Sequence, residues 1–303
     1  MVMKNLIVRS LTGVVFVAIL VGRILCGPLT YCLLFALITG LSVWEFCSLM
    51  NDNADCQINK VITTVAAVYF FFSVFAFNAN FVSSEVFIPY LLTLIYLMVS
   101  EIYLKDNNNL HNWAYTLMSQ LYVALPFAVL NTLSFFAVNY GYGEQGVIYN
   151  PIYSLSIFIF LWTNDTGAYC FGCWLGKHKL FPRISPKKSW EGVFGGAFTA
   201  LIASQIIATF TDTFCADNDL TNRLAWAGLA IVVVVFGTWG DLTESLIKRK
   251  LEIKDSGHIL PGHGGILDRF DSSLIAIPAS VIYVYMINSS YIANMIDKIS
   301  SLF

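Results

Sequence analysis

The chain has 303 residues, of which 57% are hydrophobic and only 12% are charged. Soluble domains carry roughly 25% charged residues, so this chain has about half the usual supply for a water-exposed surface. The composition excludes an ordinary water-soluble protein and indicates that lipid surrounds most of the chain. The net charge of −2 also excludes a strongly basic nucleic-acid-binding protein, so we expect no nucleic-acid partner.

Long stretches without Asp, Glu, Lys or Arg recur along the chain. A hydrocarbon core about 30 Å thick requires about 20 apolar residues of helix. The runs lack the alternation of a transmembrane barrel, so the spans must be helices. The sequence predicts an all-α polytopic membrane protein with about nine transmembrane helices, near residues 6–26, 29–50, 61–82, 86–104, 113–137, 151–176, 189–210, 223–250 and 264–288.

The first span has features of a signal peptide, because Lys4 and Arg9 precede an apolar core. The residues that follow, 23–27, offer no small-residue cleavage site, so we expect an uncleaved helix. Cys170 and Cys173 form a lone C-x-x-C without a second pair or nearby His ligands. We therefore expect neither a zinc site nor a disulfide framework.

The distribution of cations predicts the orientation. With a cytoplasmic N-terminus, nine spans place every Lys and Arg on the cytoplasmic side except Arg23, Arg223 and Lys298. The expected external loop 138–150 contains none. We predict a cytoplasmic N-terminus, an outside C-terminus and residence in a bacterial inner membrane, with the active site on the cytoplasmic side.

Two expected cytoplasmic loops, 177–188 and 248–263, hold nine Lys or Arg residues between them and adjoin spans that contain acids. The N-terminal half has no comparable loop. We therefore expect a scaffold of about five helices in residues 1–140 and a catalytic or transport half of about four helices in residues 141–303. Glu45 and Glu101 lie in spans without a motif, and we interpret them as helix-pair partners.

The end of the eighth span carries a polar stripe. Asp241, Glu244, Ser245 and Lys248 are spaced i, i+3, i+4 and i+7, which puts them on one helix face. Such a stripe is unfavourable in a membrane unless it faces protein, water or an ion. By itself the stripe indicates either salt bridges between neighbouring helices or a functional site.

The following segment favours a site. His263, Gly264 and Gly265 precede an expected helix whose free N–H groups would favour a phosphate. Asp268 and Asp271 are spaced i, i+3 on that helix, and such carboxylates suit Mg²⁺ bound with substrate phosphates. One short loop joins the two helices, so we expect Asp241 and Asp268 at similar membrane depth.

The sixth span and the loop after it carry further candidates. Asp165 lies in an otherwise apolar helix, where it is either functional or paired with a neighbouring helix. Ser189 is expected to cap the seventh helix, and Glu191 to complement the helix dipole. Lys187 and Lys188 serve either as positive-inside signals or as contacts for nucleotide phosphates and anionic headgroups.

Two stretches resemble the phosphatidate cytidylyltransferases, also called CDP-diacylglycerol synthases. Residues 245–271, SLIKRKLEIKDSGHILPGHGGILDRFD, carry every fixed element of that family's signature at its spacing. Residues 164–192 are similar to a second hallmark, D-T-x-A-Y followed by I-S-P-K-K-[ST]-x-E-G, with Gly167 in the x position. The two stretches cover about 56 residues, and the other spans match only in hydropathy.

The resemblance implies the reaction of CTP with phosphatidate to give CDP-diacylglycerol and diphosphate, in the lipid bilayer and dependent on Mg²⁺, with room for a second cation. It implies Asp241 and Asp268 as metal ligands, with Asp271 and Asp165 as further contributors. The catalytic set it implies is Asp241, Lys248, Asp268, Arg269 and Asp271. The substrate-binding set it implies is Ser185, Lys187, Lys188, Ser245, Arg249, Lys254, Asp255, His263, Gly264 and Gly265.

Other functions stay open at this point. A transporter or channel would use Asp165, Asp241 and Asp268 to line an ion path, although these acids gather on one expected side. A CTP-dependent polyprenol kinase would use the same nucleotide and metal but transfer the γ-phosphoryl group. The CDP-alcohol phosphotransferases are disfavoured because their D-G-x2-A-R run is absent. A homodimer is one assembly that we keep open.

Overall fold

The computed structural model of the chain describes residues 2–104, 108–139, 145–211, 214, 219–257 and 264–288. It divides into two compact units, Met1–Leu155 with Leu246–Leu274, and Ser156–Ser245 with Ile275–Phe303. Segment 246–274, which we assigned to the catalytic half, thus packs with the N-terminal helices. The expected division into a scaffold, residues 1–140, and a catalytic half, residues 141–303, is a division by function, and it stays a prediction.

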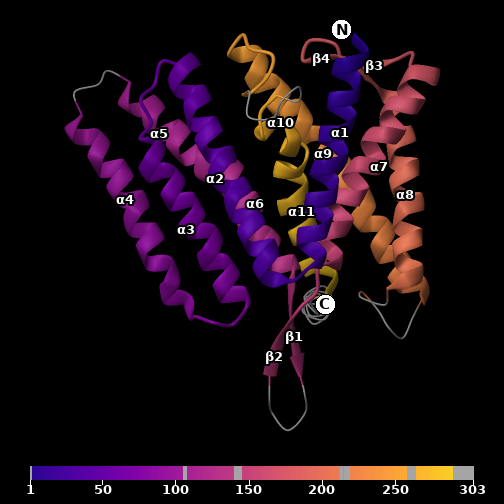
Figure 1. The fold of residues 1–303 in the computed structure, drawn as a ribbon, viewed down its shortest axis with the longest axis horizontal. Coiled ribbons are helices and arrows are strands. Elements are labelled where there is room, and N and C mark those ends of the chain that lie inside the picture. The colour runs from indigo at the N-terminus through magenta and orange to yellow at the C-terminus, as the bar shows by residue number, and fades with distance from the viewer. Residues whose placement is uncertain are drawn as a thin grey trace, which may run out of the picture. The chain divides into compact units, whose positions relative to one another are not determined.

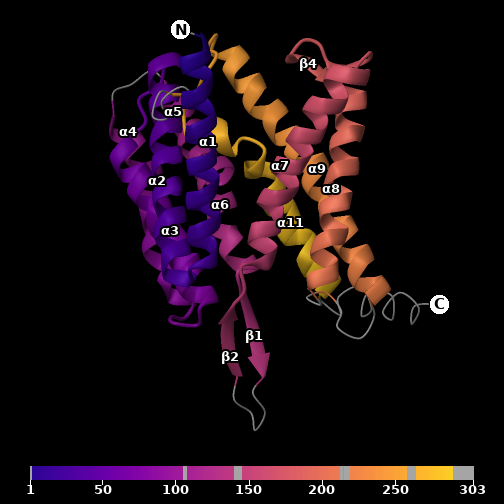
Figure 2. The ribbon, with the colours of Figure 1, turned by 45° about the vertical axis from the view of Figure 1, so that its right-hand side comes forward.

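The first unit is a helical bundle in which α2, α3 and α4 lie side by side (Figures 1 and 2). Its fully buried aromatic side chains include Tyr31, Phe35, Phe71 and Phe127, which form the apolar core between the helices. The helices are α1 Val2–Leu25, α2 Pro28–Asn53, α3 Lys60–Asn78, η1 Ser84–Phe87, α4 Ile88–Tyr103, α5 Asn109–Met118, η2 Ser119–Ala124, α6 Leu125–Leu130, η3 Asn131–Leu133 and α10 Leu267–Phe270.

The expected span 113–137 is not one regular helix. Its middle, η2, is a π-helix, and Pro126 follows directly in α6. Proline lacks the N–H that would bond four residues back, at Tyr122, so the helix widens there. Gln120 in this turn is buried and donates to the Thr63 carbonyl of α3 at 3.1 Å.

The end of that span is a β-hairpin, which corrects the expectation of an all-α protein. Strand β1, Phe135–Asn139, pairs antiparallel with β2, Gln145–Tyr149. Figure 1 shows the hairpin extending beyond the helices of its unit. The Tyr149 hydroxyl donates to the Ile24 carbonyl at 2.7 Å, which attaches the hairpin base to α1.

The second unit contains most of α7, α9 and α11, together with α8 and a second hairpin at one end of α8 (Figure 2). The hairpin occupies the region that we expected to be an irregular loop, 177–188. Its strands pair with Lys179 opposite Ser189 and Phe181 opposite Ser185. The elements are α7 Ile152–Leu175, β3 Lys179–Phe181, β4 Ser185–Ser189, α8 Trp190–Phe210, α9 Asp219–Lys250 and α11 Ser273–Asn288.

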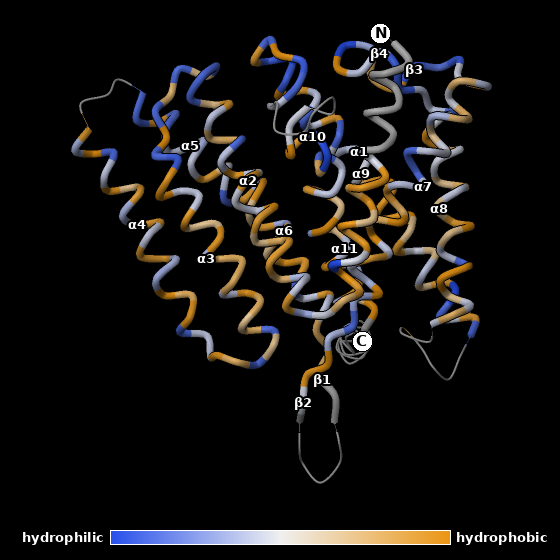
Figure 3. Tube along the Cα trace, viewed as in Figure 1, coloured by the Kyte–Doolittle hydropathy of each residue, from blue (hydrophilic) through white to orange (hydrophobic). Residues whose placement is uncertain are grey.

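Within the described residues, seven helical segments are long and apolar enough to cross a membrane. They make the chain an integral membrane protein, and Figure 3 shows apolar residues along helices such as α3 with polar residues near their ends. The segments are Pro28–Asn53, Lys60–Asn78, Ser84–Tyr103, Asn109–Leu133, Trp190–Phe210, Asp219–Lys250 and Leu267–Ile287.

The other two expected spans are also helices. In α1, whose side chains are described from Thr12 on, the apolar segment is Thr12–Leu25. In α7 the polar residues 164–166 interrupt the apolar run. The expected total of nine spans and the sides on which the termini lie therefore stay predictions.

Small residues let α7 and α8 approach closely. The Thr199 hydroxyl of α8 donates to the Thr163 carbonyl of α7 at 2.9 Å. A Cβ atom added to Gly196 would lie 2.7 Å from the Asn164 backbone oxygen, too close for a normal contact. Close backbone approach through small residues is a common basis of helix association in lipid, where burial of apolar side chains gives little advantage.

We expect Gly196→Ala to destabilise the protein by about 1–3 kcal/mol, because the added methyl group overpacks the α7–α8 interface. The matched control is Gly22→Ala in α1, where an added Cβ has no neighbour within 4 Å. Alanine favours a helix over glycine by about 0.5–1 kcal/mol, so the control should be neutral or stabilising. Thermal unfolding of both variants in detergent measures the difference, and equal midpoints would contradict the close contact.

Candidate functional site

The polar face of α9 is formed as the spacing predicts. Asp241 and Ser245 lie one turn apart, and the Ser245 hydroxyl donates to Asp241 Oδ1 at 3.1 Å. Asp241 Oδ2 lies 2.5 Å from the Lys188 ammonium of β4. The Asp241 side chain is 30% exposed, so water or a ligand can still reach it. In the second unit, an acid of α9 and a cation of the hairpin therefore meet.

The β3–β4 hairpin holds Lys188 in that position. Successive side chains of a strand point to opposite faces, so Lys187 is exposed while Lys188 is half-buried. Ser189 ends the strand and caps α8, because its hydroxyl accepts from the Gly192 N–H at 3.2 Å. Glu191 binds the His178 ring nitrogen at 2.6 Å and so closes the base of the hairpin. The structural interpretation of Ser189 and Glu191 is confirmed.

Asp268, in the first unit, is almost fully enclosed by donors. Its Oδ1 atom lies 2.9 Å from the Lys248 ammonium. Its Oδ2 atom accepts from the backbone N–H groups of Ser256 at 3.0 Å and of Gly265 at 2.9 Å. The Asp268 side chain is only 6% exposed, and that of Lys248 is 16% exposed. This buried ion pair connects the end of α9 to α10.

Another group lies close to the backbone at Gly264 and Gly265, as expected. That group is a side-chain carboxylate of the protein and not a phosphate. Gly264 has a φ of +82°, which favours glycine, and a Cβ there would crowd the Asp268 carboxylate. The N–H groups of Ile266 and Leu267 donate to Glu45 at 2.9 and 3.1 Å. The N–H groups of Gly265, Ile266 and Leu267, which we expected to be free, are therefore occupied by carboxylates. Substrate binding by Gly264 and Gly265 stays a prediction.

Glu45 is the functional candidate that sequence reasoning missed. We interpreted it as a helix-pair partner, but its carboxylate binds an irregular segment more than 200 residues away: the Ser256 hydroxyl donates to Oε1 at 2.5 Å. Glu45 is 5% exposed. The signal was present, because an acid inside an apolar span is a functional candidate by default, as we argued for Asp165. Glu101, by contrast, is confirmed as a helix partner, since Asn112 of α5 donates to it at 2.9 Å.

The other expected site residues lie as follows. Asp165 is exposed on α7, and Ser185 is half-buried on β4. Asp271 is half-buried after α10, where its carboxylate accepts from the Ser272 N–H at 2.5 Å. His263 lies outside the described residues. The exposed candidates near Lys248 and Asp268 in sequence are Arg249, Lys254, Asp255 and Arg269.

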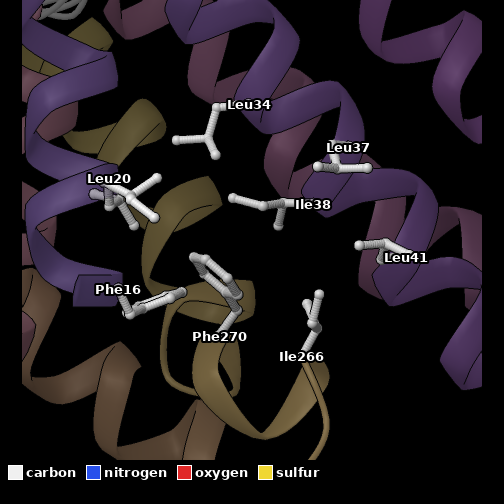
Figure 4. A pocket seen from close by; sticks show the side chains of 9 residues that line it. Phe16, Leu20, Leu34, Leu37, Ile38, Leu41, Ile266 and Phe270 are labelled. Atoms are coloured by element: carbon white, nitrogen blue, oxygen red, sulfur yellow. The ribbon is translucent and has the colours of Figure 1, made fainter. Parts of the chain in front are cut away.

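An apolar pocket of about 150 Å³ lies beside α10 in the first unit (Figure 4). Phe16 and Leu20 of α1, Ile38 of α2, and Ile266 and Phe270 line it together with further apolar residues of α1 and α2. Phe16 and Phe270 contact edge to face, with ring centroids 5.7 Å apart. Apolar packing thus holds one side of the segment that carries Asp268.

Asp241 and Ser245 offer partly exposed oxygen atoms of the kind that a hard cation prefers. Lys188 already meets one of the Asp241 oxygens, so a cation bound there would share the carboxylate with that ammonium or displace it. No three His, Cys, Asp or Glu side chains gather in the part of the chain that the structure describes. Mg²⁺ usually takes one or two carboxylates and completes its shell with water and phosphate oxygens, so a sparse set suffices. Asp268 fits less directly, because Lys248 and two N–H groups already meet its oxygens.

The buried Lys248–Asp268 pair gives a test of stability. Removing one partner of a buried pair leaves an uncompensated charge, so Lys248→Met should destabilise the protein by about 3 kcal/mol or more. Lys248→Met combined with Asp268→Asn removes both charges and should recover a substantial part of that loss. Unfolding of both single variants and of the double variant measures the coupling, and additive losses would show that the pair does not form.

Comparison with known proteins covers nearly the whole chain. Residues 7–287 match the sequence model of the cytidylyltransferase family. The phosphatidate cytidylyltransferase of Staphylococcus haemolyticus is 33% identical over 274 residues, which are 89% of this chain and 96% of the relative. The enzymes of the same name from Staphylococcus aureus and Haemophilus influenzae are 34% and 31% identical, again over 89% of this chain and over 96% and 95% of their own lengths. The chain belongs to the cytidylyltransferase family.

Proposed function

We propose that the protein is a phosphatidate cytidylyltransferase, which converts CTP and phosphatidate into CDP-diacylglycerol and diphosphate for phospholipid synthesis. The observation that carries this proposal is the 33–34% identity to enzymes of that name over nearly their whole length. The lysine–carboxylate contacts support it, because the lysine of each contact lies in one of the two stretches that resemble the family in sequence.

The reaction is a nucleotidyl transfer that needs no covalent nucleophile from the protein. An oxygen of the lipid phosphate attacks the α-phosphorus of CTP, and the bond to the bridging oxygen of the β-phosphate breaks, releasing diphosphate. A phosphate monoester is already largely ionised near pH 7, so no general base is required. Two anions must approach each other, so positioning and charge neutralisation should supply most of the catalysis.

The lysines of the two pairs are the residues that we assign to this neutralisation. Lys188 is held by Asp241, and Lys248 is held by Asp268, so each ammonium is fixed before substrate binds. A fixed cation loses less entropy when a phosphate arrives, which is the advantage of preorganisation. The exposed side chains of Lys187, Arg249, Lys254 and Arg269 add further cations for the triphosphate or the lipid phosphate.

Mg²⁺ is part of the proposal. Asp241, with Ser245 beside it, would hold the ion, and Asp268, Asp271 and Asp165 are the further ligands that the family resemblance implies. When bound, the ion would neutralise charge on the substrate phosphates. A second cation, assembly as a homodimer, and an ion shared by Asp241 and Asp268 stay predictions.

We also propose that the site faces the cytoplasm and that the N-terminus lies on the same side. The concentration of Lys and Arg in segments 177–188 and 248–263 supports this orientation through the positive-inside rule. Residence in a bacterial inner membrane is supported by the bacterial source of the relatives. Accessibility of a single introduced cysteine in segment 177–188 to a membrane-impermeant reagent would check the side.

We expect the purified protein in detergent, given Mg²⁺, CTP and phosphatidate, to release diphosphate and form CDP-diacylglycerol. Chelation of divalent cations should abolish the reaction, because the substrate phosphates would then lack their counter-ion. Thin-layer chromatography of labelled lipid and a diphosphate assay measure the products. A polyprenol kinase would instead release CDP and phosphorylate its lipid. Folded protein that makes no cytidylylated lipid would refute the proposal.

Asp268→Asn should abolish turnover while leaving membrane insertion intact, because it removes the anionic partner of Lys248 without changing side-chain volume. Asp241→Asn should do the same through Lys188. The matched control is Asp219→Asn at the other end of α9, where the exposed acid binds Arg223 at 2.8 Å. Its activity should stay close to that of the unchanged protein. Near-normal activity of Asp268→Asn would remove this residue from the site.

A further inference from the structure

We propose that Glu45 of α2 is a positioning residue for the segment that carries Asp268. It acts through the backbone of residues 256 and 265–267 and touches no substrate. The proposal rests on the proposed function for its effect on activity, but the contacts that carry it are independent of that function.

The Glu45 carboxylate accepts hydrogen bonds from three donors of the segment 256–267. Its Oε1 atom accepts from the Ser256 hydroxyl and from the Leu267 N–H, and its Oε2 atom accepts from the Ile266 N–H. All three partners are neutral donors. Gly257 and Gly265 lie directly against the carboxylate, and a Cβ at either position would crowd it. The segment is therefore shaped to receive this acid.

Asp268 binds the other side of the same backbone. Ser256 gives its hydroxyl to Glu45 and its N–H to Asp268. The next donors alternate in the same way, because the Gly265 N–H goes to Asp268 and the Ile266 N–H goes to Glu45. One short stretch of backbone is thus held between two carboxylates. A shift of this backbone at Glu45 must change the donors that orient Asp268, and with them the Lys248 contact.

The negative charge of Glu45 is essential to this arrangement. Hydrogen bonds to an ionised acceptor are roughly twice as strong as those between neutral groups. In Glu45→Gln one carboxylate oxygen becomes an NH₂ group, which cannot accept. That group would face an N–H or O–H donor, so at least one contact must break and the segment must move.

Glu101 supplies a matched control in the same unit. It is also a buried acid in an apolar helix, 6% exposed against 5% for Glu45. Its carboxylate accepts from the Asn112 side chain of α5. Glu101→Gln therefore makes the same chemical change at the same burial. It should affect the scaffold without affecting Asp268.

The experiment compares Glu45→Gln with Glu101→Gln in the full-length protein in detergent. Hydrogen exchange followed by mass spectrometry reports the amides of residues 251–257 and 264–270. We expect faster exchange there in Glu45→Gln only. For cytidylyl transfer we expect kcat to fall about 10- to 100-fold in Glu45→Gln, since a displacement near 1 Å can have that effect. The KM for CTP should change much less, because the affected interaction acts mainly in the transition state.

Ser256→Ala and Glu45→Asp extend the test. Ser256→Ala removes one donor to Glu45 but keeps the Ser256 N–H to Asp268, so its loss should be smaller and should not add to that of Glu45→Gln. Glu45→Asp keeps the charge and should restore part of the kcat lost in Glu45→Gln. If Glu45→Gln does not fold, the comparison of Glu45→Asp with Glu101→Asp gives the same contrast.

The outcomes separate this inference from the proposed function. Equal exchange and equal kcat in Glu45→Gln and Glu101→Gln would show that Glu45 is only a buried scaffold acid, and would overturn the positioning role. An unchanged protein that makes no CDP-diacylglycerol would refute the proposed function, while the exchange data would still test whether Glu45 holds the segment.

Discussion

A carboxylate inside an apolar bundle must be met by hydrogen-bond donors, because lipid and packed hydrocarbon offer none. In the first unit, most of these donors are backbone N–H groups. The N–H groups at residues 256 and 265–267 converge on Glu45 and Asp268, and Lys248 adds a charge partner. Residues 264–266 are not helical, which makes those N–H groups available. The start of α10 only at Leu267 is therefore consistent with accommodating two acids.

This arrangement also changes where substrate phosphates can bind. A glycine-rich turn before a helix normally offers backbone N–H groups to an anion. Here Glu45 and Asp268 already accept from those N–H groups. In the proposed function the phosphates therefore meet side-chain cations instead, and Lys188 and Lys248, each held by an acid, are the cations that we assign to this role.

Much of the helical fold could be predicted from apolar runs, since lipid requires long helices and tolerates few charges. Segments 29–50, 61–82 and 189–210 are close to α2, α3 and α8. The hairpins were missed because strand pairing depends on contacts that an apolar run does not reveal. In addition, the apolar residues of β1 continue the expected span 113–137. The break between α10 and α11 was also missed, because no glycine or proline marks it in the sequence.

The candidate site shows the same limit. The Asp241–Ser245 contact is local, and helical spacing predicted it. The pairing of Lys188 with Asp241 depends on how a hairpin packs against α9, and no local rule gives it. Glu45 is the extreme case, because its partners Ile266 and Leu267 lie 221 and 222 residues away. Residue types and spacing identified the acids, but only the fold assigned their partners.

The last two residues of β4 have opposite tasks. Lys188 faces the acid of α9, and Ser189, on the other face of the strand, caps α8. A slip of one residue in the hairpin would put a neighbouring residue into each position. In one direction Lys188 would replace Ser189 and bring an ammonium to the positive end of the α8 dipole. In the other direction Ser189 would replace Lys188 and leave Asp241 facing a hydroxyl, while Trp190 would replace the cap. Either slip removes the Ser189 cap, so the start of α8 helps to fix the register of the strand.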